Sequence, residues 1–326
     1  MSERTKDYDY ILPDELIAQR PLPRRDDSRM IVLHRESKSI EHRRFGDLPA
    51  FVSRGDLLVL NNTRVLPARR FSDDGRIEFL FLEKLAPAKW RCLVKPGRKM
   101  RVGATTRIDG ALVQVEEICA EGERIICFDR EIDPFQKGRM PLPPYLHRDG
   151  DTEDDLRYQT VFADVAGAIA APTAGLHFTR EILSRLPHVF VTLHVGTGTF
   201  RPVQSERLTG HQMHAEHFAI SEEAAGAINR AQRIVAVGTT TVRVLEAAAR
   251  RDGKLFAQEG ATALFIHPPY EFREVDRLLT NFHLPRSTLL MLVCAFAGRE
   301  FVLKAYAEAV RKRYRFYSYG DCMLIL

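Results

Sequence analysis

The amino-acid sequence predicts an α/β fold in which a mostly parallel sheet domain with helices is interrupted by an inserted small antiparallel β-barrel domain. After Arg157, strand patterns alternate with helix patterns, which is typical of a mostly parallel sheet. From Pro67 onward, short β-forming runs separated by turn residues instead favour an antiparallel barrel. We therefore expect residues 1–65 and 150–326 to form the α/β domain, the second range carrying most of the active site, and residues 66–149 to form the barrel.

The first part of the α/β domain is expected to contribute two strands. Apolar and β-branched residues cluster at Met30–His34 and at Asp56–Leu60, after a short helical turn at Asp14–Ala18. The segment Asn61–Val65 has turn chemistry and ends this part of the domain. Because both strands precede the β-rich stretch, we expect them to join the sheet of the later residues, which makes the β-rich stretch an insertion.

The inserted barrel is defined by four short strand patterns. Asp-Gly, Pro-Gly and Glu-Gly pairs separate them, and such pairs are typical of tight turns. The strands are expected at Arg76–Leu82, Trp90–Val94, Ala111–Glu117 and Arg124–Asp129. The proline-rich Met140–Leu146 and the acidic, disordered-looking Arg148–Asp155 then indicate an exit linker.

The second part of the α/β domain alternates strands with helices whose starts are marked by capping residues. Thr179, Ser221 and Ser287 each stand where a side-chain hydroxyl can accept a hydrogen bond from the first turn of a helix. Helices are expected at Thr179–Leu186, from Ser221, at Val242–Arg250, from Ser287 to Gly298 and at Glu300–Arg313, and strands at His188–Val195 and Arg233–Gly238.

The composition fits a folded globular protein, with 45% hydrophobic and 28% charged residues. The formal net charge of +5 suits an acidic partner such as RNA, although many enzymes without one carry as much. Eleven basic but only four acidic residues lie between Arg69 and Arg107, around the basic loop Lys95–Gly103. That loop can meet phosphates or be a solvated turn, and a second basic run, Arg311–Arg315, ends the last helix pattern.

The five cysteines are scattered and form no Cys-x-x-Cys pair, which gives no support to a zinc ribbon or an iron–sulfur cluster. Their positions in apolar runs predict reduced, buried thiols in a cytoplasmic protein. The charged N-terminus lacks the apolar stretch of a secretory signal, and the longest apolar run, Leu289–Ala297, is too short to span a membrane. We expect a monomer without a membrane partner.

Three short polar segments with glycines and histidines lie close together in the sequence. They are Ala170–Thr179, Leu193–Phe200 and His211–Glu216. Imidazoles with pKa values near ~6.5 beside a carboxylate suit proton transfer at neutral pH. The candidate proton-transfer residues are therefore His177, His194, His211, His214 and Glu216.

A metal-dependent hydrolase is the competing class for the third segment. His211, His214 and His217 are three residues apart, close to the spacing of metal ligands. The order is not the His-Glu-x-x-His arrangement of a zinc helix, and no further carboxylate or cysteine nearby completes a ligand set. We therefore expect no metal.

Two further motifs each precede a helix pattern. Gly238–Arg243 (GTTTVR) follows a strand, at the edge of an α/β sheet where ligands bind and a helix N-terminus favours negative groups. The alternative is that one threonine caps the helix and Arg243 forms a surface pair. In Leu278–Thr288, Asn281 and His283 flank an aromatic ring, a combination suited to stacking on a base and bonding its edge. A buried loop histidine bonded to backbone is the alternative for His283.

Taken together, the motifs resemble the S-adenosylmethionine:tRNA ribosyltransferase-isomerase family of queuosine biosynthesis. The resemblance runs from DYDYILPDELIAQRPLPRRDDSR at Asp7 to YRFYSYGDCMLIL at the C-terminus. Between them come GDLLVLNNTRVLPAR, LVKPGRKMRVG, MPLPPY, RYQTVFA, AAPTAGLHFT, LHVGTGTFRPV, GTTTVR and LLTNFHLPRSTLLMLV. Each motif is weak alone, but the ordered set across the chain is specific. The sequence departs from the family pattern at Ala263, where an aspartate is common, and at Pro269, where a glycine is.

The resemblance implies an α/β domain interrupted by a β-barrel, and a specific reaction. The ribosyl part of S-adenosylmethionine would be transferred and isomerised onto 7-aminomethyl-7-deazaguanine at the wobble position of tRNA. The products would be epoxyqueuosine-tRNA, adenine and methionine. S-adenosylmethionine would thus be a ribosyl donor, and no metal is implied. The competing classes are the metal-dependent hydrolase and a non-catalytic tRNA-binding protein.

For this reaction, the glycines and threonines would let the backbone approach the nucleoside, and Thr240 with Arg243 would hold the methionyl carboxylate or a ribose hydroxyl. The candidate substrate-binding residues are Thr173, Gly175, Gly196, Gly198, Thr199, Thr240, Arg243, Asn281 and His283. The tRNA would lie over the basic face of the barrel, and its candidate contacts are Lys95, Arg98, Lys99 and Arg101. Which histidine is the base and which the acid is left open.

Overall fold

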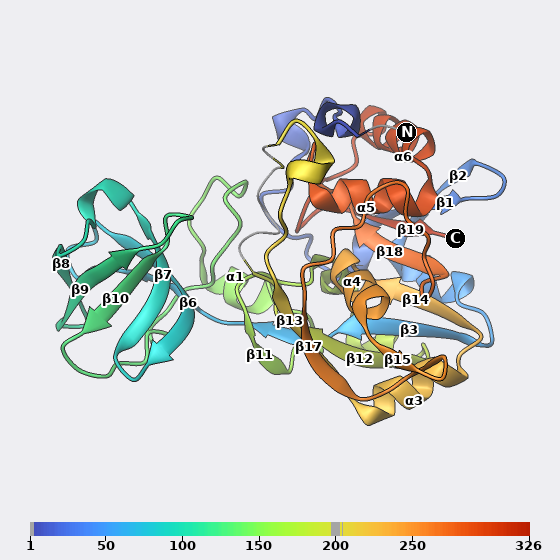
Figure 1. Ribbon diagram of the computed structural model, residues 1–326. Helices are drawn as coiled ribbons and strands as arrows, with labels where there is room; N and C mark the ends of the chain where they lie inside the picture. Colours follow the sequence, from blue (N-terminus) through green and yellow to red (C-terminus); the bar gives the residue numbers. More distant parts are fainter. Residues whose placement is uncertain (1–2, 197–202, 204) are drawn as a thin grey trace. The chain divides into compact units, whose positions relative to one another are not determined.

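The computed structural model describes residues 3–196, 203 and 205–326, and it divides the chain into two compact units (Figure 1). The first unit comprises residues 1–64, 143–148 and 157–326. The second comprises residues 65–142 and 149–156, so it excludes 143–148, which the predicted insertion contained. No helix in the described part of the chain is long and apolar enough to cross a membrane.

The first unit is built on a nine-stranded sheet with the order β17-β13-β12-β3-β14-β18-β19-β1-β2. Its strands are β1 (Arg29–His34), β2 (Ser39–Arg44), β3 (Asp56–Asn61), β12 (His188–Leu193), β13 (Glu216–Ile220), β14 (Arg233–Val237), β17 (Gln258–Thr262), β18 (Arg277–Asn281) and β19 (Cys322–Ile325). Strands β12, β3, β14 and β18 run parallel to one another, as do β19 and β1. The early strands β1 and β3 therefore join the later ones in one sheet.

The sheet is mixed, and the prediction of a mostly parallel sheet needs this correction. The pairs β1–β2, β12–β13, β13–β17 and β18–β19 are antiparallel. Strand β2 returns from β1 after only four residues, 35–38, which is too short for the crossover that a parallel neighbour requires. The polar sequence of β2 hid it from prediction, since its burial pattern has no buried residue.

Helices and 3₁₀ turns cover both faces of this sheet (Figure 1). Alternate residues of β3 face opposite sides, so that Leu57 and Val59 join one core and Leu58 and Leu60 join the other. The first core includes residues of α3 (Glu222–Arg230), α4 (Thr239–Ala247), α5 (Thr288–Ala297) and α6 (Arg299–Arg311), and the second includes residues of α2 (Arg180–Leu183) and of the 3₁₀ turn η4 (Phe45–Phe51). Burial on both faces explains why the central strands are continuous apolar runs.

The predicted helix caps are confirmed. The side-chain oxygens of Thr179, Ser221 and Ser287 accept hydrogen bonds from backbone N–H groups three residues on, at 3.1 to 3.2 Å. Helix α4 begins at Thr239, earlier than the predicted Val242, so the three threonines occupy its first turn. Helix α2 is shorter than predicted.

The second unit contains a curled six-stranded antiparallel sheet with the order β5-β6-β7-β10-β9-β8 (Figure 1). Its strands are β5 (Arg69–Phe71), β6 (Glu78–Ala86), β7 (Lys89–Lys95), β8 (Thr105–Ile108), β9 (Ala111–Ile118) and β10 (Arg124–Phe128). All four predicted strands are present. A hydrogen bond of 2.8 Å from the Asp73 amide to the Arg107 carbonyl joins the ends of the two edge strands.

Shorter elements complete the chain. Strands β4 (Thr63–Val65) and β11 (Val165–Ala168) form one small sheet, and β15 (Arg250–Arg251) pairs with β16 (Lys254–Leu255). The acidic run predicted as a linker instead contains the helix α1 (Thr152–Arg157). The Asp151 carboxylate accepts hydrogen bonds from the Glu153 and Asp154 amides, which satisfies the free N–H groups at the start of this helix.

Candidate active site

Polar residues collect at one edge of the nine-stranded sheet. The parallel strands β3, β12, β14 and β18 end at this edge, and β19 and β1 begin there, because Asn281 pairs with Cys322 and Met30 also pairs with Cys322. Ligands of α/β proteins bind outside the carboxyl ends of parallel strands. The predicted segments around His177, Gly238 and Asn281 all meet this edge.

His177 is the centre of a buried hydrogen-bond network at this edge. Its Nδ1 lies 2.8 Å from the Ser28 hydroxyl, and its Nε2 lies 3.2 Å from the Asn281 Oδ1. Because the Asn281 amide nitrogen donates to the Tyr317 carbonyl at 3.0 Å, Oδ1 is the atom left to accept from His177. The ring therefore carries its proton on Nε2, and Nδ1 accepts from Ser28.

Burial lowers the pKa of His177 to about 4, although the hydrogen bond with Asn281 acts in the opposite direction. The positive charges of Arg25 and Arg315 lower it further. His177 is consequently neutral at pH 7, and both ring nitrogens are occupied by protein groups. The structure brings His177 and Asn281 together, and it adds Ser28, which the sequence analysis missed.

His194 follows β12 and has a different environment. Its Nδ1 lies 2.8 Å from the Thr63 hydroxyl, and no described residue bonds its Nε2. The ring also packs against Gly167 of β11, where a Cβ atom would come within 2.6 Å of the imidazole. The half-buried position and the nearby His217 lower the pKa of His194. One ring nitrogen is thus bonded within the protein, and the other has no partner among the described residues.

Glu216 and Arg243, predicted separately for proton transfer and ligand binding, form a buried ion pair with each other. Glu216 also accepts a hydrogen bond of 3.0 Å from the Gly196 amide. Arg243 donates to the carbonyls of Thr262 and Leu264, at 3.2 and 3.1 Å. The pair therefore ties the turn after β12 to helix α4 and to the chain after β17. Thr262 and Leu264 flank Ala263, where the sequence departs from the family pattern. Both contacts are made to backbone carbonyls, so neither requires the side chain at position 263.

Thr240 has a buried hydroxyl for which no described residue is a hydrogen-bond partner. Thr240 lies in the first turn of α4, which follows Gly238, a residue with a φ of 91°. Only 7% of the Thr240 surface is exposed. The next hydroxyl, of Thr241, instead donates to the Val237 carbonyl at 2.8 Å. A buried polar group without a partner calls for an explanation, and at the start of a helix a bound polar group is one.

Of the other predicted residues, Gly175 and His283 are held inside the protein and Thr173 is half-buried. The 3₁₀ turn η6 (Thr173–His177) carries Thr173 and Gly175, and a Cβ atom at Gly175 would come within 2.8 Å of the Thr160 side chain. The His283 Nε2 bonds the Thr280 hydroxyl at 2.8 Å, and burial lowers the pKa of His283 to about 3. This enclosure favours the alternative of a buried loop histidine over a base reader.

The histidines of the third predicted segment, and the neighbouring His217, lie in different surroundings. His211 packs edge-on against Phe265 with ring centroids 5.3 Å apart, and partial burial, followed by the charge of His214, lowers its pKa. His214 and His217 are exposed. Among the described residues, no three His, Cys, Asp or Glu side chains are grouped as metal ligands. Gly198 and Thr199 lie outside the residues that the structure describes.

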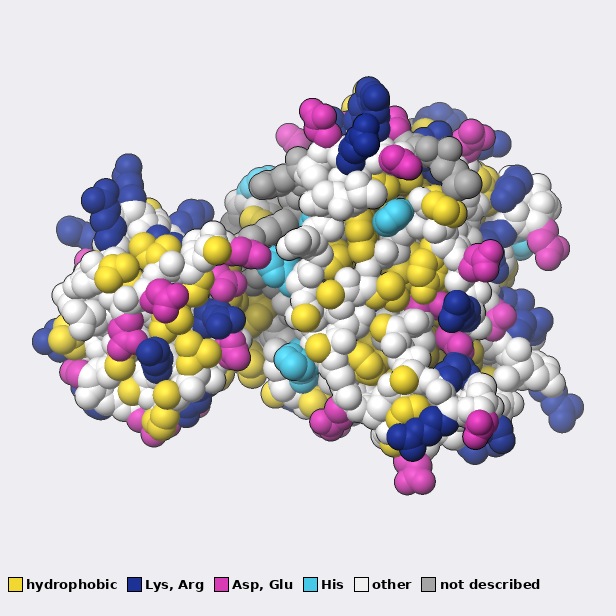
Figure 2. Space-filling view, in the orientation of Figure 1, with side chains coloured by type: hydrophobic (Ala, Val, Ile, Leu, Met, Phe, Trp, Pro, Cys, Tyr) yellow, Lys and Arg dark blue, Asp and Glu magenta, His cyan; other side chains and the backbone are white. Residues whose placement is uncertain are grey.

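The predicted tRNA contacts belong to the second unit. Lys95 ends β7, and the 3₁₀ turn η5 (Gly97–Lys99) follows it. Lys95, Arg98, Lys99 and Arg101 are all exposed, and Figure 2 shows Lys and Arg side chains gathered over η5. The basic loop is therefore accessible to a polyanion.

The fold and the site define an α/β protein with imidazole, hydroxyl and amide groups at the carboxyl edge of a mixed sheet. These groups are suited to proton transfer on a bound molecule. A family model described as "Queuosine biosynthesis protein" matches residues 5–325. The chain belongs to this family.

Relatives of nearly the same length carry one name, S-adenosylmethionine:tRNA ribosyltransferase-isomerase. Proteins from Symbiobacterium thermophilum and Thermotoga petrophila are 51% and 49% identical to this chain, over 99% of it and 100% of each relative. The crystal structure of an S-adenosylmethionine tRNA ribosyltransferase from Thermotoga maritima is 40% identical, covers 98% of this chain and 100% of its own, and has a TM-score of 0.57.

Proposed function

We propose that this chain is an S-adenosylmethionine:tRNA ribosyltransferase-isomerase that acts on 7-aminomethyl-7-deazaguanine at the tRNA wobble position. The observation that supports this most strongly is the full-length similarity to relatives with that name, at 49 to 51% identity. The products would be epoxyqueuosine-tRNA, adenine and methionine. We expect the chain to act in the cytoplasm as a monomer, with tRNA as its macromolecular partner and S-adenosylmethionine as the ribosyl donor.

The reaction makes specific demands on side chains. The sulfonium acidifies the adjacent 5′ carbon, so a base is needed there, and adenine leaves more readily when a ring nitrogen is protonated. The aminomethyl nitrogen attacks as the neutral amine, forms a new N–C bond and loses a proton, while the bond from a ribosyl carbon to adenine breaks. Formation of the epoxide then makes a C–O bond at the carbon attached to sulfur, and the C–S bond breaks to release methionine. General acid–base groups typically contribute ~10²–10⁴-fold each.

His194 meets the demand for proton exchange better than His177 does. Thr63 fixes one of its ring nitrogens, and no described residue occupies the other. Both nitrogens of His177 are bonded within the protein, so its role would be to hold Ser28 and Asn281 toward the substrate. The hydroxyl of Thr240 would receive a polar group of the S-adenosylmethionine, at the positive end of α4.

The test is incubation of the purified chain with S-adenosylmethionine and tRNA that carries the deazaguanine precursor. We expect release of adenine and methionine in equal amounts, with no release from tRNA that carries guanine at the same position. A chain that binds the precursor tRNA but releases neither product would be a non-catalytic tRNA-binding protein, and the proposal would be wrong. A chelator should leave the rate unchanged, whereas a metal-dependent hydrolase would be inactivated.

A further inference from the structure

The C-terminal loop, residues 315–321, leads into β19 at the same sheet edge as His177, and the reaction chemistry above gives it no part. The loop closes tightly, because the Asp321 amide donates to the Arg315 carbonyl at 2.8 Å. A Cβ atom at Gly320 would come within 2.5 Å of the same carbonyl oxygen, so a larger residue there would force the backbone to shift. The sequence therefore builds a compact loop beside the candidate site.

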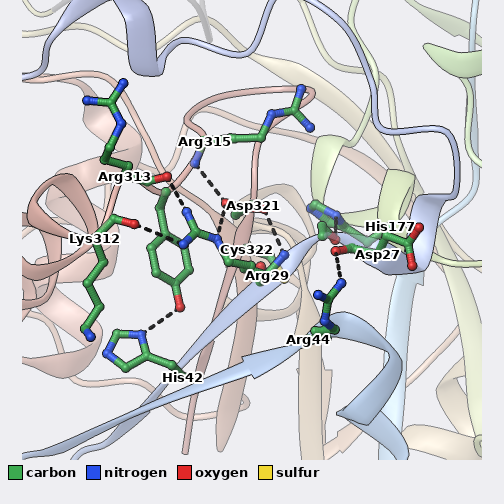
Figure 3. Close-up of polar contacts among 12 residues, drawn as sticks. Asp27, Arg29, His42, Arg44, His177, Lys312, Arg313, Arg315, Asp321 and Cys322 are labelled. Atoms are coloured by element: carbon green, nitrogen blue, oxygen red, sulfur yellow. Dashed lines mark hydrogen bonds and ion pairs between the residues drawn. The ribbon is translucent and has the colours of Figure 1, made fainter.

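The carboxylate of Asp321 joins this loop to the start of β1. Its Oδ1 accepts a hydrogen bond of 2.8 Å from the Arg29 amide, and its Oδ2 accepts one of 2.8 Å from the Arg315 amide (Figure 3). The Arg29 Nε lies 3.4 Å from Oδ2. Only 1% of Asp321 is exposed, and burial raises its pKa, whereas the bonds from the two amides lower it. Burying a carboxylate is costly, and these bonds compensate for the lost water.

Each of the two segments that Asp321 joins carries a contact to the His177 network. Ser28 immediately precedes β1, and its hydroxyl lies 2.8 Å from the His177 Nδ1. In the loop, the Tyr317 carbonyl accepts from the Asn281 side-chain amide at 3.0 Å, and the Asn281 Oδ1 lies 3.2 Å from the His177 Nε2. Tyr317 has a φ of 69°, which residues with a side chain rarely adopt, so its position depends on the bonds around it. Both partners of the imidazole therefore depend on segments that one carboxylate ties together.

We propose that Asp321 is a positioning residue of the active site, which holds Ser28 and Asn281 in place against His177. Asp321 does not touch the substrate, and it acts through the imidazole network. The inference rests on the proposed function, since it assumes that this network takes part in adenine release. A displacement of about 1 Å at a reacting centre can slow a reaction by ~10²-fold, which is the size of effect expected when the network loosens.

The first test uses Asp321→Asn, which keeps the size of the side chain but removes one acceptor. One carboxylate oxygen is replaced by an NH₂ group, which cannot accept a hydrogen bond from a backbone amide. One of the two joined segments is then released. We expect kcat for adenine release, measured at saturating S-adenosylmethionine and precursor tRNA, to fall by ~10²-fold.

The same substitution in a His177→Gln background separates positioning from general stability. If Asp321 acts through His177, the network is already broken in this background. Asp321→Asn should then change kcat by no more than ~2-fold, because the effects of coupled residues are not additive. An equal fall of kcat in both backgrounds would show that Asp321 supports the fold alone, and the inference would be wrong.

A second readout is independent of catalysis. In the chain labelled with ¹⁵N-histidine, the Nε2–H signal of His177 is identified as the one that His177→Gln removes. We expect Asp321→Asn to shift or broaden this signal, because Asn281 is no longer held. Asp321→Glu keeps both oxygens but moves them by one methylene group. It should shift the signal as well, and it replaces Asp321→Asn if that variant does not fold.

Asp56 provides the matched control, since it is a buried carboxylate at the start of β3, on the opposite edge of the same sheet. It is 3% exposed and accepts hydrogen bonds from the Ser53 amide at 2.7 Å and from the Arg233 and Arg277 side chains at 2.6 and 3.0 Å. We expect Asp56→Asn to lower the melting temperature but to leave kcat and the His177 signal unchanged.

The two readouts also separate this inference from the proposed function. A folded Asp321→Asn chain with an unaltered His177 signal would overturn the positioning role, whatever its melting temperature. If the unsubstituted chain releases no adenine, the proposed function fails, and the His177 signal still decides whether Asp321 holds the network.

Discussion

Two histidines at the same sheet edge differ in what surrounds their ring nitrogens. His177 is enclosed between Ser28 and Asn281, whereas His194 has one nitrogen on Thr63 and the other unoccupied by any described residue. The same residue type therefore serves two purposes. We propose that the enclosed ring holds the site together and that the partly open ring exchanges a proton with the substrate.

The enclosed ring makes stability depend on pH. The pKa of His177 is about 4 in the folded protein and ~6.5 in the unfolded chain, so the unfolded state binds more protons between these values. Its stabilising contribution is complete above pH ~6.5 and is lost as the pH falls toward 4. We expect the free energy of unfolding to fall across this window, by up to about 3 kcal/mol from this residue.

Denaturant unfolding at a series of pH values measures that fall. The His177→Gln variant cannot titrate at this position, so its stability should decline less between pH 6.5 and 4, with the remainder assigned to other groups such as His283. An equally steep decline in the variant would show that His177 is not the neutral buried group described.

The partly open ring predicts a loss of activity without a loss of folding. His194→Ala should reduce adenine release by ~10²–10⁴-fold, the range for an acid–base group. Thr63→Val leaves the imidazole but removes the hydroxyl that orients it, so a smaller fall in kcat with little change in KM is expected. His147→Ala, at an exposed histidine outside the candidate set, is the matched control and should retain activity. Full activity of His194→Ala would remove it from the mechanism.

Strand β11 shapes the site because its residue Gly167 has no side chain. A Cβ atom at Gly167 would lie 2.6 Å from His194 Cε1, so the ring would have to move. We expect Gly167→Ala to reduce adenine release nearly as much as His194→Ala, and also to lower the melting temperature, because the backbone φ at Gly167 is 156°. Gly226→Ala in α3 meets only the end of the Arg230 side chain and should keep full activity. An active Gly167→Ala variant would mean that the His194 position is not critical.

Local sequence signals predicted the elements well where the structure depends on local chemistry. The hydroxyls of Ser221 and Ser287 cap their helices as expected, because capping involves residues only three apart. Elements that form by pairing with distant parts of the chain were not predicted. Strand β18 is not among the predicted strands, and in the structure it pairs with β19. The polar strand β2 was also not predicted, and it forms because it pairs with β1.

For the whole molecule, the site is assembled from distant parts of the chain. Ser28 and His177 are 149 residues apart, and His177 and Asn281 are 104 apart. The sheet brings them together because strands β1 and β18 meet the same edge. The motifs predicted that His177 and Asn281 belong to one site, but not that Ser28 joins them or that His283 is enclosed. Burial depends on how the whole chain folds, so it cannot be predicted from a single motif.

The central claim is that S-adenosylmethionine gives up its ribosyl carbons to tRNA, and isotope transfer tests it most directly. The chain would be incubated with precursor-containing tRNA and S-adenosylmethionine radiolabelled either in the ribosyl carbons or in the methyl group. We predict that the ribosyl label enters the tRNA while the methyl label stays with free methionine. Methyl label in the tRNA, or no label from either donor, would contradict the account.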